Sequence, residues 1–281
     1  MDRRAPGRAH EGQVGNPTQS RGMHRFLIAP SDVRGSTILI TDPRELRHLR
    51  AVLRLGPGDR IRCLDGAGVE YVGLIREVMP DGVLVSIEER TSEPASVKPP
   101  RWLAQSLLKS DRFDWALQKA TELGATRITP LITARTVVAV SEEHRSRKCA
   151  RWRRIAEEAA KQCGRACVPM IEAPQRMTRW RPEPPPGVAL IATLASGGEP
   201  IHEVLGHERT LAQAQRGGAL ILIGPEGDFT PEEVRIAERL GIRPVSLGPL
   251  TLRAETAAVA ALAILGYVLD GKASSTGPGS R

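Results

Sequence analysis

The sequence predicts an α/β protein in which a small β-rich barrel precedes a parallel sheet covered by helices on both faces. Strand-like runs separated by Gly, Pro and Asp turns fill residues 24–92, a spacing typical of a small barrel. From residue 101 onward, strand-like and helix-like runs alternate, which indicates βαβ units and a parallel sheet. The proline-bearing stretch 94–100 between the two regions is expected to be a linker.

Composition and charge restrict the class of protein. Hydrophobic residues make up 41% of the 281 positions but aromatic residues only 3%, so the core depends on Leu, Val, Ile and Ala. Lys and Arg outnumber Asp and Glu by 40 to 32, which favours a polyanionic partner. The four cysteines form no C-x-x-C pair, so we expect reduced, mostly buried thiols in a cytoplasmic protein and no metal site. The longest apolar run, Ala257–Leu265, is too short to cross a bilayer, so no membrane partner is expected.

The first region contains one predicted helix beside its strands. Residues 1–22 lack an apolar segment and are expected to be a disordered tail, as are residues 271–281. Asp42, Pro43 and Glu45 predict a helix start with a capping box, and Gly56 is expected to close that helix. The helical period places three leucines on the inner side and three basic residues on the other, Arg47, Arg50 and Arg54. A basic face without acids favours phosphate contact over a merely solvated surface.

Helix ends are also marked in the second region. Thr230, Pro231 and Glu233 form a capping box with proline at the first helical position, and Gly241 is expected to close that helix. Gly124 and Gly164 are expected to end two more helices, the second of them basic, with Cys163 on its core face.

Two predicted strands end in Gly-Pro turns. The run 220–223 meets Gly224-Pro225-Glu226-Gly227, and a later strand meets Gly248-Pro249. Carboxyl ends of parallel strands share one edge, where ligands bind, and glycine lets a ligand approach the backbone. No Lys-Ser/Thr pair follows the glycines, which excludes a nucleotide-phosphate loop, and Glu226 would repel an anion. We therefore expect one pocket in which main-chain groups hold a neutral or cationic ligand.

Five motifs together resemble one known family, the small-subunit ribosomal RNA uridine-N3 methyltransferases. They belong to the SPOUT class of S-adenosylmethionine enzymes. The motifs, in order, are HLRAVLRLGPGD, QKATELGATRITPLIT, QCGR, ILIGPEGD and LGPLTLRAETA, and the resemblance covers roughly residues 23–270. It implies a PUA-like RNA-binding barrel over residues 23–93, then a SPOUT domain over residues 101–270 with a C-terminal deep trefoil knot. A homodimer is implied as well. The helix 255–269 is apolar nearly all round and needs burial on several sides, which either a single domain or a twofold partner could supply.

The resemblance also implies roles for individual residues. The backbone that would hold S-adenosylmethionine comprises Thr193, Leu194, Leu222, Ile223, Gly224, Pro225, Glu226, Gly227, Leu247, Gly248, Leu252 and Thr256. Arg253 is the candidate donor that stabilises negative charge on a uridine deprotonated at N3, and Glu255 either orients Arg253 or acts as the base. Arg165, in the QCGR motif, joins Arg47, Arg50 and Arg54 as a candidate RNA contact. The implied partner is the small-subunit (16S) ribosomal RNA or the assembled subunit.

The chain departs from the family pattern at a few positions, and other functions stay open. Asp228 stands where glycine is common, Leu250 where a basic residue is common and Ala254 where threonine is frequent, and the segment around Thr193 and Leu194 differs too. One alternative is a knotted methyltransferase that acts on a transfer RNA ribose 2′-hydroxyl, although the Ser-Leu-Asn loop of those enzymes is missing from the C-terminal motif. The other is a non-enzymatic RNA-binding assembly factor.

Overall fold

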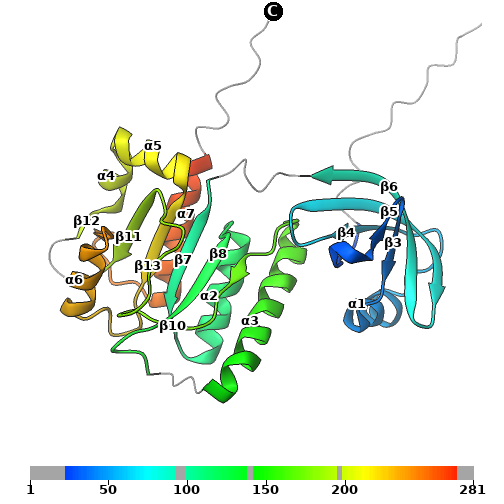
Figure 1. The fold of residues 1–281 in the computed structure, drawn as a ribbon, viewed down its shortest axis with the longest axis horizontal. Helices are drawn as coiled ribbons and strands as arrows, with labels where there is room; N and C mark the ends of the chain where they lie inside the picture. The colour runs from blue at the N-terminus through cyan, green and yellow to red at the C-terminus, as the bar shows by residue number, and fades with distance from the viewer. Residues whose placement is uncertain (1–22, 93–98, 138–141, 195–197, 271–281) are drawn as a thin grey trace, which may run out of the picture.

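The computed structural model describes residues 23–92, 99–137, 142–194 and 198–270, which form two sheets side by side (Figure 1). The predicted tails, 1–22 and 271–281, and most of the predicted linker lie outside the described residues. None of the helices in the described ranges is long and apolar enough to span a membrane. The same ranges contain no cluster of three His, Cys, Asp or Glu side chains that could hold a metal ion.

The N-terminal sheet curves around one core. Its strands are β1 (Arg25–Leu27), β2 (Val33–Arg34), β3 (Thr37–Ile40), β4 (Arg60–Leu64), β5 (Val69–Met79) and β6 (Gly82–Ser92), in the order β1-β4-β5-β6-β3-β2. All neighbours are antiparallel except β1 and β4. Register shifts between Val72 and Gly73 and between Ile75 and Glu77 bend the long β5–β6 hairpin. A Cβ on Gly73 would lie 2.5 Å from Val85. The runs predicted as strands, corresponding to β3 to β6, are confirmed.

The helix of this region differs from the predicted one. Asp42 caps α1 (Pro43–Arg47) as predicted, because its carboxylate accepts hydrogen bonds from the backbone N–H groups of Arg44 and Glu45. The next turn, η3 (His48–Val52), is a π turn, which shifts the register of the chain. Arg54, at φ 55°, therefore takes the left-handed position after the helix, and the prediction that Gly56 closes it was wrong.

The C-terminal sheet is parallel throughout, as predicted. Its order is β10-β8-β7-β13-β11-β14-β12, with β9 paired to β8. The strands are β7 (Arg101–Ser106), β8 (Arg127–Ile132), β9 (Met170–Ile171), β10 (Gln175–Arg176), β11 (Val188–Ala192), β12 (Glu199–Pro200), β13 (Ala219–Ile223) and β14 (Arg243–Ser246). Alternate residues of β13 enter two different cores, Ile221 on one face and Leu220 and Leu222 on the other. The sheet is thus covered on both faces.

Six helices of the described residues cover this sheet (Figure 1). They are α2 (Ser110–Glu122), α3 (Glu142–Cys163), α4 (Ile201–Gly206), α5 (Glu208–Gly217), α6 (Pro231–Arg239) and α7 (Ala254–Asp270). The capping box of Thr230 and Glu233 is confirmed, and Gly124, Gly164 and Gly241 have the left-handed φ that ends a helix. Cys163 is exposed, so its predicted place on the core face of α3 was wrong.

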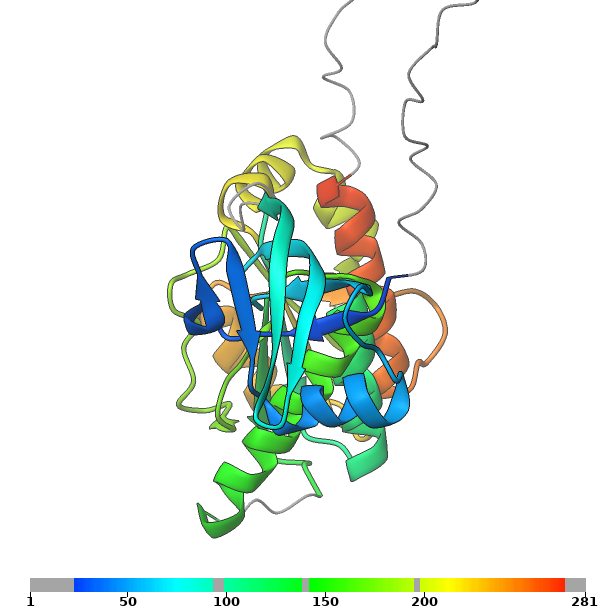
Figure 2. The ribbon, with the colours of Figure 1, turned by 90° about the vertical axis from the view of Figure 1, so that its right-hand side faces the viewer.

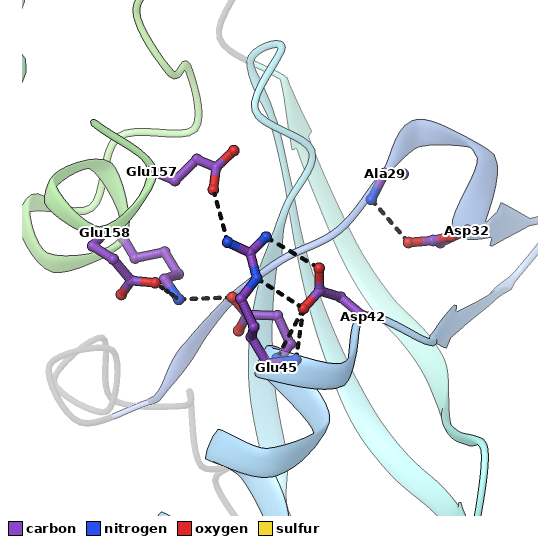
Figure 3. A network of polar contacts seen from close by, with 8 residues as sticks. Ala29, Asp32, Asp42, Glu45, Glu157 and Glu158 are labelled. Carbon is purple, nitrogen blue, oxygen red and sulfur yellow. Dashed lines mark hydrogen bonds and ion pairs between the residues drawn. The ribbon is translucent and has the colours of Figure 1, made fainter. Parts of the chain in front are cut away.

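The two units meet along α3, which packs against β1 and is joined to α1 by side-chain ion pairs; Figure 2 shows the N-terminal sheet in front of the green helices. Glu45, predicted to complete a capping box, instead accepts a hydrogen bond of 2.7 Å from Lys161, and both side chains are at least nine-tenths buried. Figure 3 shows Glu45 facing Glu158 of α3, which lies 2.9 Å from the same lysine. Burial alone would lower the pKa of Lys161, but its bonds to Glu45 and Glu158 outweigh burial and raise it. Lys161 therefore stays charged and fixes the two units together.

Replacing Lys161 with Met would leave the Glu45 carboxylate buried without its cation. We expect the free energy of unfolding, measured by urea denaturation, to fall by about 3–5 kcal/mol. Glu158→Gln is the matched control, because that side chain is 58% exposed; it should cost less than about 1 kcal/mol. If Lys161→Met unfolded at the same urea concentration as the control, the buried pair would not stabilise the junction.

Candidate functional site

Three neighbouring strands end at one rim of a pocket. β11 lies between β13 and β14, and Ala192 is in register with Ile223 on one side and Val245 on the other. The segments that follow these strands therefore start at the same level of the sheet edge. They surround a cavity of about 710 Å³, a size typical of a site for one small organic ligand.

Most of the predicted ligand-binding residues line this cavity. Those that do are Thr193, Leu194, Ile223, Gly224, Pro225, Glu226, Leu247, Gly248 and Leu252, together with Arg253. Three do not: Leu222 is buried within β13, Gly227 lies against Arg135, and Thr256 is exposed on α7. The two Gly-Pro turns thus form walls of one pocket, as the strand order requires.

Glycines permit both turns for different reasons. A Cβ on Gly224 would lie 3.2 Å from the ring of Phe229 and 3.3 Å from the backbone of Asp228, so the turn is packed tightly on its own chain. Gly248 has open space around it but a φ of 128°, which side chains rarely adopt. Its N–H donates to the Ser246 hydroxyl at 3.2 Å, which holds that strained turn at the end of β14.

A carboxylate links two walls of the pocket. Asp228 Oδ2 accepts hydrogen bonds from the Thr193 hydroxyl at 3.0 Å and from the Leu194 N–H at 2.8 Å. The backbone N–H of Thr193 donates to Val245 O at 3.1 Å. Thr193 consequently joins the ends of β11, β13 and β14. Sequence analysis predicted Thr193 and Leu194 as cofactor-binding residues, but it noted Asp228 only as a departure from the family pattern.

Arg112 is a pocket residue that the sequence analysis missed. It lies in the first turn of α2, after β7, whose carboxyl end is beside that of β13. Its guanidinium lies 3.4 Å from Glu226 and 3.9 Å from Glu255. The signal that was available is topological: every loop after a parallel strand reaches the same sheet edge, including the loop after β7.

The two candidate catalytic residues differ in exposure. Arg253 is exposed at the pocket rim. The Glu255 side chain is 12% exposed, does not line the cavity, and has Arg112 rather than Arg253 as its ion-pair partner among the described residues. Its Oε2 atom is buried and makes no hydrogen bond within the part of the chain that the structure describes. A role for Glu255 in orienting Arg253 therefore has no contact to support it.

The four arginines predicted to contact RNA fall into two groups. Arg47 and Arg54 are exposed. Arg50 is half-buried and donates hydrogen bonds to the carbonyl groups of Met79, Pro80 and Gly82, so the prediction that it faces outward was wrong.

Arg165 is also half-buried. Its Nη1 donates to the carbonyl oxygens of Thr121 at 2.6 Å and Ala125 at 2.9 Å, and burial lowers its pKa. This guanidinium joins the end of α2 to the end of α3, and its contact with RNA stays a prediction.

The lining of the pocket suits a ligand with charges of both signs. Glu226 and Asp228 supply carboxylates, Arg112 and Arg253 supply guanidinium groups, and the rest is mostly apolar side chains and main chain. Such a lining fits S-adenosylmethionine, which carries a sulfonium, an ammonium and a carboxylate and has no phosphate.

Comparison with known proteins gives a consistent family. Residues 96–266 match the model of an RNA methyltransferase domain, and residues 40–88 that of an RNA methyltransferase PUA domain. Ribosomal RNA small subunit methyltransferase E of Synechocystis is 32% identical, over 88% of this chain and 78% of its own length. The protein of that name from Bacillus subtilis is also 32% identical, over 79% of this chain and 87% of its own.

Two solved structures of similar proteins align with this chain over almost their whole length. The Neisseria gonorrhoeae ribosomal RNA small subunit methyltransferase E, described as bound to S-adenosyl methionine, is 29% identical with a TM-score of 0.75. A methyltransferase of Legionella pneumophila in complex with the cofactor SAM is 30% identical with a TM-score of 0.76. Each alignment covers 87% of this chain and 97% of the other.

Replacing Gly248 with Ala tests the strained turn. Its φ of 128° is unfavourable for alanine, so we expect a loss of about 1–3 kcal/mol in the free energy of unfolding, measured by urea denaturation. Gly206→Ala is the matched control, because no atom lies within 4 Å of its Cβ position and its φ is not left-handed. Equal stability of the two variants would mean that the backbone at residue 248 relaxes without cost.

Proposed function

The chain belongs to the RNA methyltransferase family that includes ribosomal RNA small subunit methyltransferase E, and we propose that it methylates N3 of one uridine in the small-subunit (16S) ribosomal RNA. S-adenosylmethionine is the proposed methyl donor. The observation that carries the proposal is the pocket at the ends of β11, β13 and β14, with Arg253 at its rim. Relatives aligned over most of this chain are named ribosomal RNA small subunit methyltransferase E, and two solved relatives are described as bound to S-adenosylmethionine.

The three strand-end segments are the proposed cofactor site. Main-chain groups of Thr193–Leu194, Ile223–Glu226 and Leu247–Leu252 would hold the cofactor, which supplies an electrophilic methyl group on its sulfonium. Gly224 lets the turn pack closely on Phe229 and Asp228 of its own chain, while Glu226 provides negative charge on the segment after β13. Holding the methyl group and the target nitrogen in one orientation supplies a large part of the rate acceleration.

Arg253 is the proposed catalytic residue. N3 of uridine becomes nucleophilic when its proton passes to the solvent at the exposed rim, and the resulting negative charge spreads over N3, O2 and O4. A guanidinium at the rim donates hydrogen bonds to that charge and lowers the free energy of the transition state. Glu255 acts as a positioning residue, because its ion pair with Arg112 ties the start of α7 to the residue that also contacts Glu226.

The N-terminal unit is the proposed RNA-docking surface. Arg47 and Arg54 are exposed on it, and its residues 40–88 match an RNA methyltransferase PUA domain. We propose a PUA-like barrel over residues 23–93 and the methyltransferase domain over 101–270, acting on folded RNA or the assembled subunit in the cytoplasm. The Lys161–Glu45 pair would keep this surface at a fixed orientation to the pocket.

A SPOUT-type trefoil knot is the proposed topology of the C-terminal segment. The chain leaves β13, passes beyond β11 to form β14, and then returns as α7 to pack against β13 and β7. The segment 247–253 therefore connects an outer strand to a helix over the middle of the sheet. A loop crossing of this kind is a prerequisite of the knot.

Helix α7 is the proposed dimer interface. One side of it is buried in the core of the chain, but Ala263 and Tyr267, one turn apart, are exposed, the tyrosine to 84%. Exposed apolar side chains on such an apolar helix favour a contact with another protein surface, here α7 of a second copy of the chain. A twofold axis along α7 would bring the two pockets of a homodimer near the interface.

Nucleoside analysis tests the proposed reaction. The protein is incubated with small ribosomal subunits from cells that lack it and with methyl-labelled S-adenosylmethionine; digestion should then yield labelled 3-methyluridine. Arg253→Ala should lose about 10²–10³-fold in the rate of transfer while its cofactor affinity, measured by calorimetry, changes by less than about threefold. Arg235→Ala, an exposed arginine on α6 paired with Glu232, is the control that keeps activity.

Two results would contradict this function, and a third would contradict the role of Arg253. A ribose-methylated nucleoside would indicate a different target atom, and folded protein that binds no cofactor would indicate an assembly factor. Full activity of Arg253→Ala would remove the role proposed for that guanidinium.

Tyr267→Arg tests the dimer. We expect the sedimenting mass of the variant to be half that of the wild type, because the charge would lie in the apolar interface. Val52→Arg, which changes a 65% exposed valine on the N-terminal unit, should sediment as the wild type does. A Tyr267→Arg protein that sediments as a dimer would place the interface elsewhere.

A further inference from the structure

The carboxylate of Asp228 makes a connection that the sheet does not make. The register between β11 and β13 ends at Ala192 and Ile223, and beyond these residues the two chains are no longer paired with each other. Asp228 Oδ2 bridges this gap through the Thr193 hydroxyl and the Leu194 N–H. On its other side, Thr193 is held by its own N–H on Val245 O. The rim segment Thr193–Leu194 is thus fastened to both neighbouring walls.

Asp228 makes these hydrogen bonds from a left-handed backbone conformation, which is less favourable for aspartate than for glycine. Its φ is 61°, in the left-handed region where glycine sits without strain and aspartate is tolerated less easily. Glycine would fit that turn better but offers no acceptor. The turn itself does not need the carboxylate, which instead accepts two hydrogen bonds from the pocket rim.

The rim depends on this contact because little else covers it. The side chain of Leu194 is 63% exposed and lines the pocket, so packing does not fix it in place. Its backbone N–H, held by a charged acceptor at 2.8 Å, is the point that sets the direction of the chain there. A rim ordered in advance lowers the entropy cost of binding a ligand.

We propose that Asp228 is a positioning residue that fixes Thr193–Leu194 in the arrangement that receives S-adenosylmethionine, before the cofactor binds. This inference rests on the proposed function. It concerns the affinity of the cofactor and not the methyl-transfer step, because the residues assigned to that step are on the segment after β14. Loss of the carboxylate should therefore raise the KM for the cofactor and leave kcat and the KM for RNA unchanged.

Two substitutions separate the hydrogen bonds from the charge. Asp228→Gly keeps the left-handed backbone and removes the acceptor. Asp228→Asn also tolerates that backbone and keeps an amide oxygen that can accept both bonds, but removes the negative charge. Glu232→Gln is the matched control, an exposed carboxylate-to-amide change on α6.

Two readouts are needed on each protein. The first is the dissociation constant of S-adenosylmethionine by calorimetry, in which Asp228→Gly should bind roughly tenfold more weakly and Asp228→Asn within about threefold of the wild type. The second is amide hydrogen exchange of Leu194 without cofactor, which should be at least about tenfold faster in Asp228→Gly than in the wild type. Thermal unfolding should show the same midpoint for all the variants.

The outcomes distinguish this inference from the function it rests on. Equal cofactor affinity of Asp228→Gly and wild type would overturn it, and so would unchanged exchange of Leu194. Weakened binding by Asp228→Asn with slow Leu194 exchange would also overturn it, because the charge and not the positioning would then act. A wild type that binds no cofactor would contradict the proposed function instead, while Leu194 exchange would still decide whether Asp228 orders the rim.

Discussion

The pocket depends on one constraint: three adjacent parallel strands end at the same level of the sheet edge. The carboxyl ends of parallel strands in register lie at one edge of the sheet, so the segments after β11, β13 and β14 start next to one another. Two of these segments turn at a glycine and leave the pocket open. Gly224 packs closely on its own loop, and Gly248 has a positive φ that other residues rarely adopt. Thr193, bonded to both neighbours, makes the three ends one unit.

The junction between the two units follows a different logic. Burying a lysine with a glutamate has a desolvation cost, but losing one partner costs more because the other charge is left buried, so the Lys161–Glu45 pair disfavours separation of the two units. An enzyme that must place one nucleotide of a large RNA in a small pocket benefits from a docking surface whose distance from that pocket does not vary. Under the proposed function, the exposed Arg47 and Arg54 of the N-terminal unit and Arg253 at the rim would contact one RNA together.

Local signals made much of the fold predictable, and non-local contacts account for what was missed. The Thr230 capping box is confirmed because a cap involves residues three apart. Glu45 has the same local signature, yet its partner Lys161 is 116 residues away, and no spacing rule reveals such a pair. The same holds for Arg112, whose contact Glu226 is 114 residues distant. Arg50 was misplaced because an ideal helical period ignores the π turn that redirects it onto the β5–β6 hairpin. The two Gly-Pro turns of the pocket were predictable because strand ends and glycine turns are local, whereas the individual lining residues came from the family resemblance. The hydrogen bonds that tie the walls together are not local, and neither source revealed them.

Amide hydrogen exchange with and without S-adenosylmethionine tests the cofactor site most directly. If the three strand ends jointly hold the cofactor, its binding should slow exchange in Thr193–Leu194, in 224–227 and in 247–253 at once, with the strands beneath them unaffected. Protection confined to one of these segments, or located instead in the groove between α2 and α3 around Trp115, would contradict a site built from three strand ends.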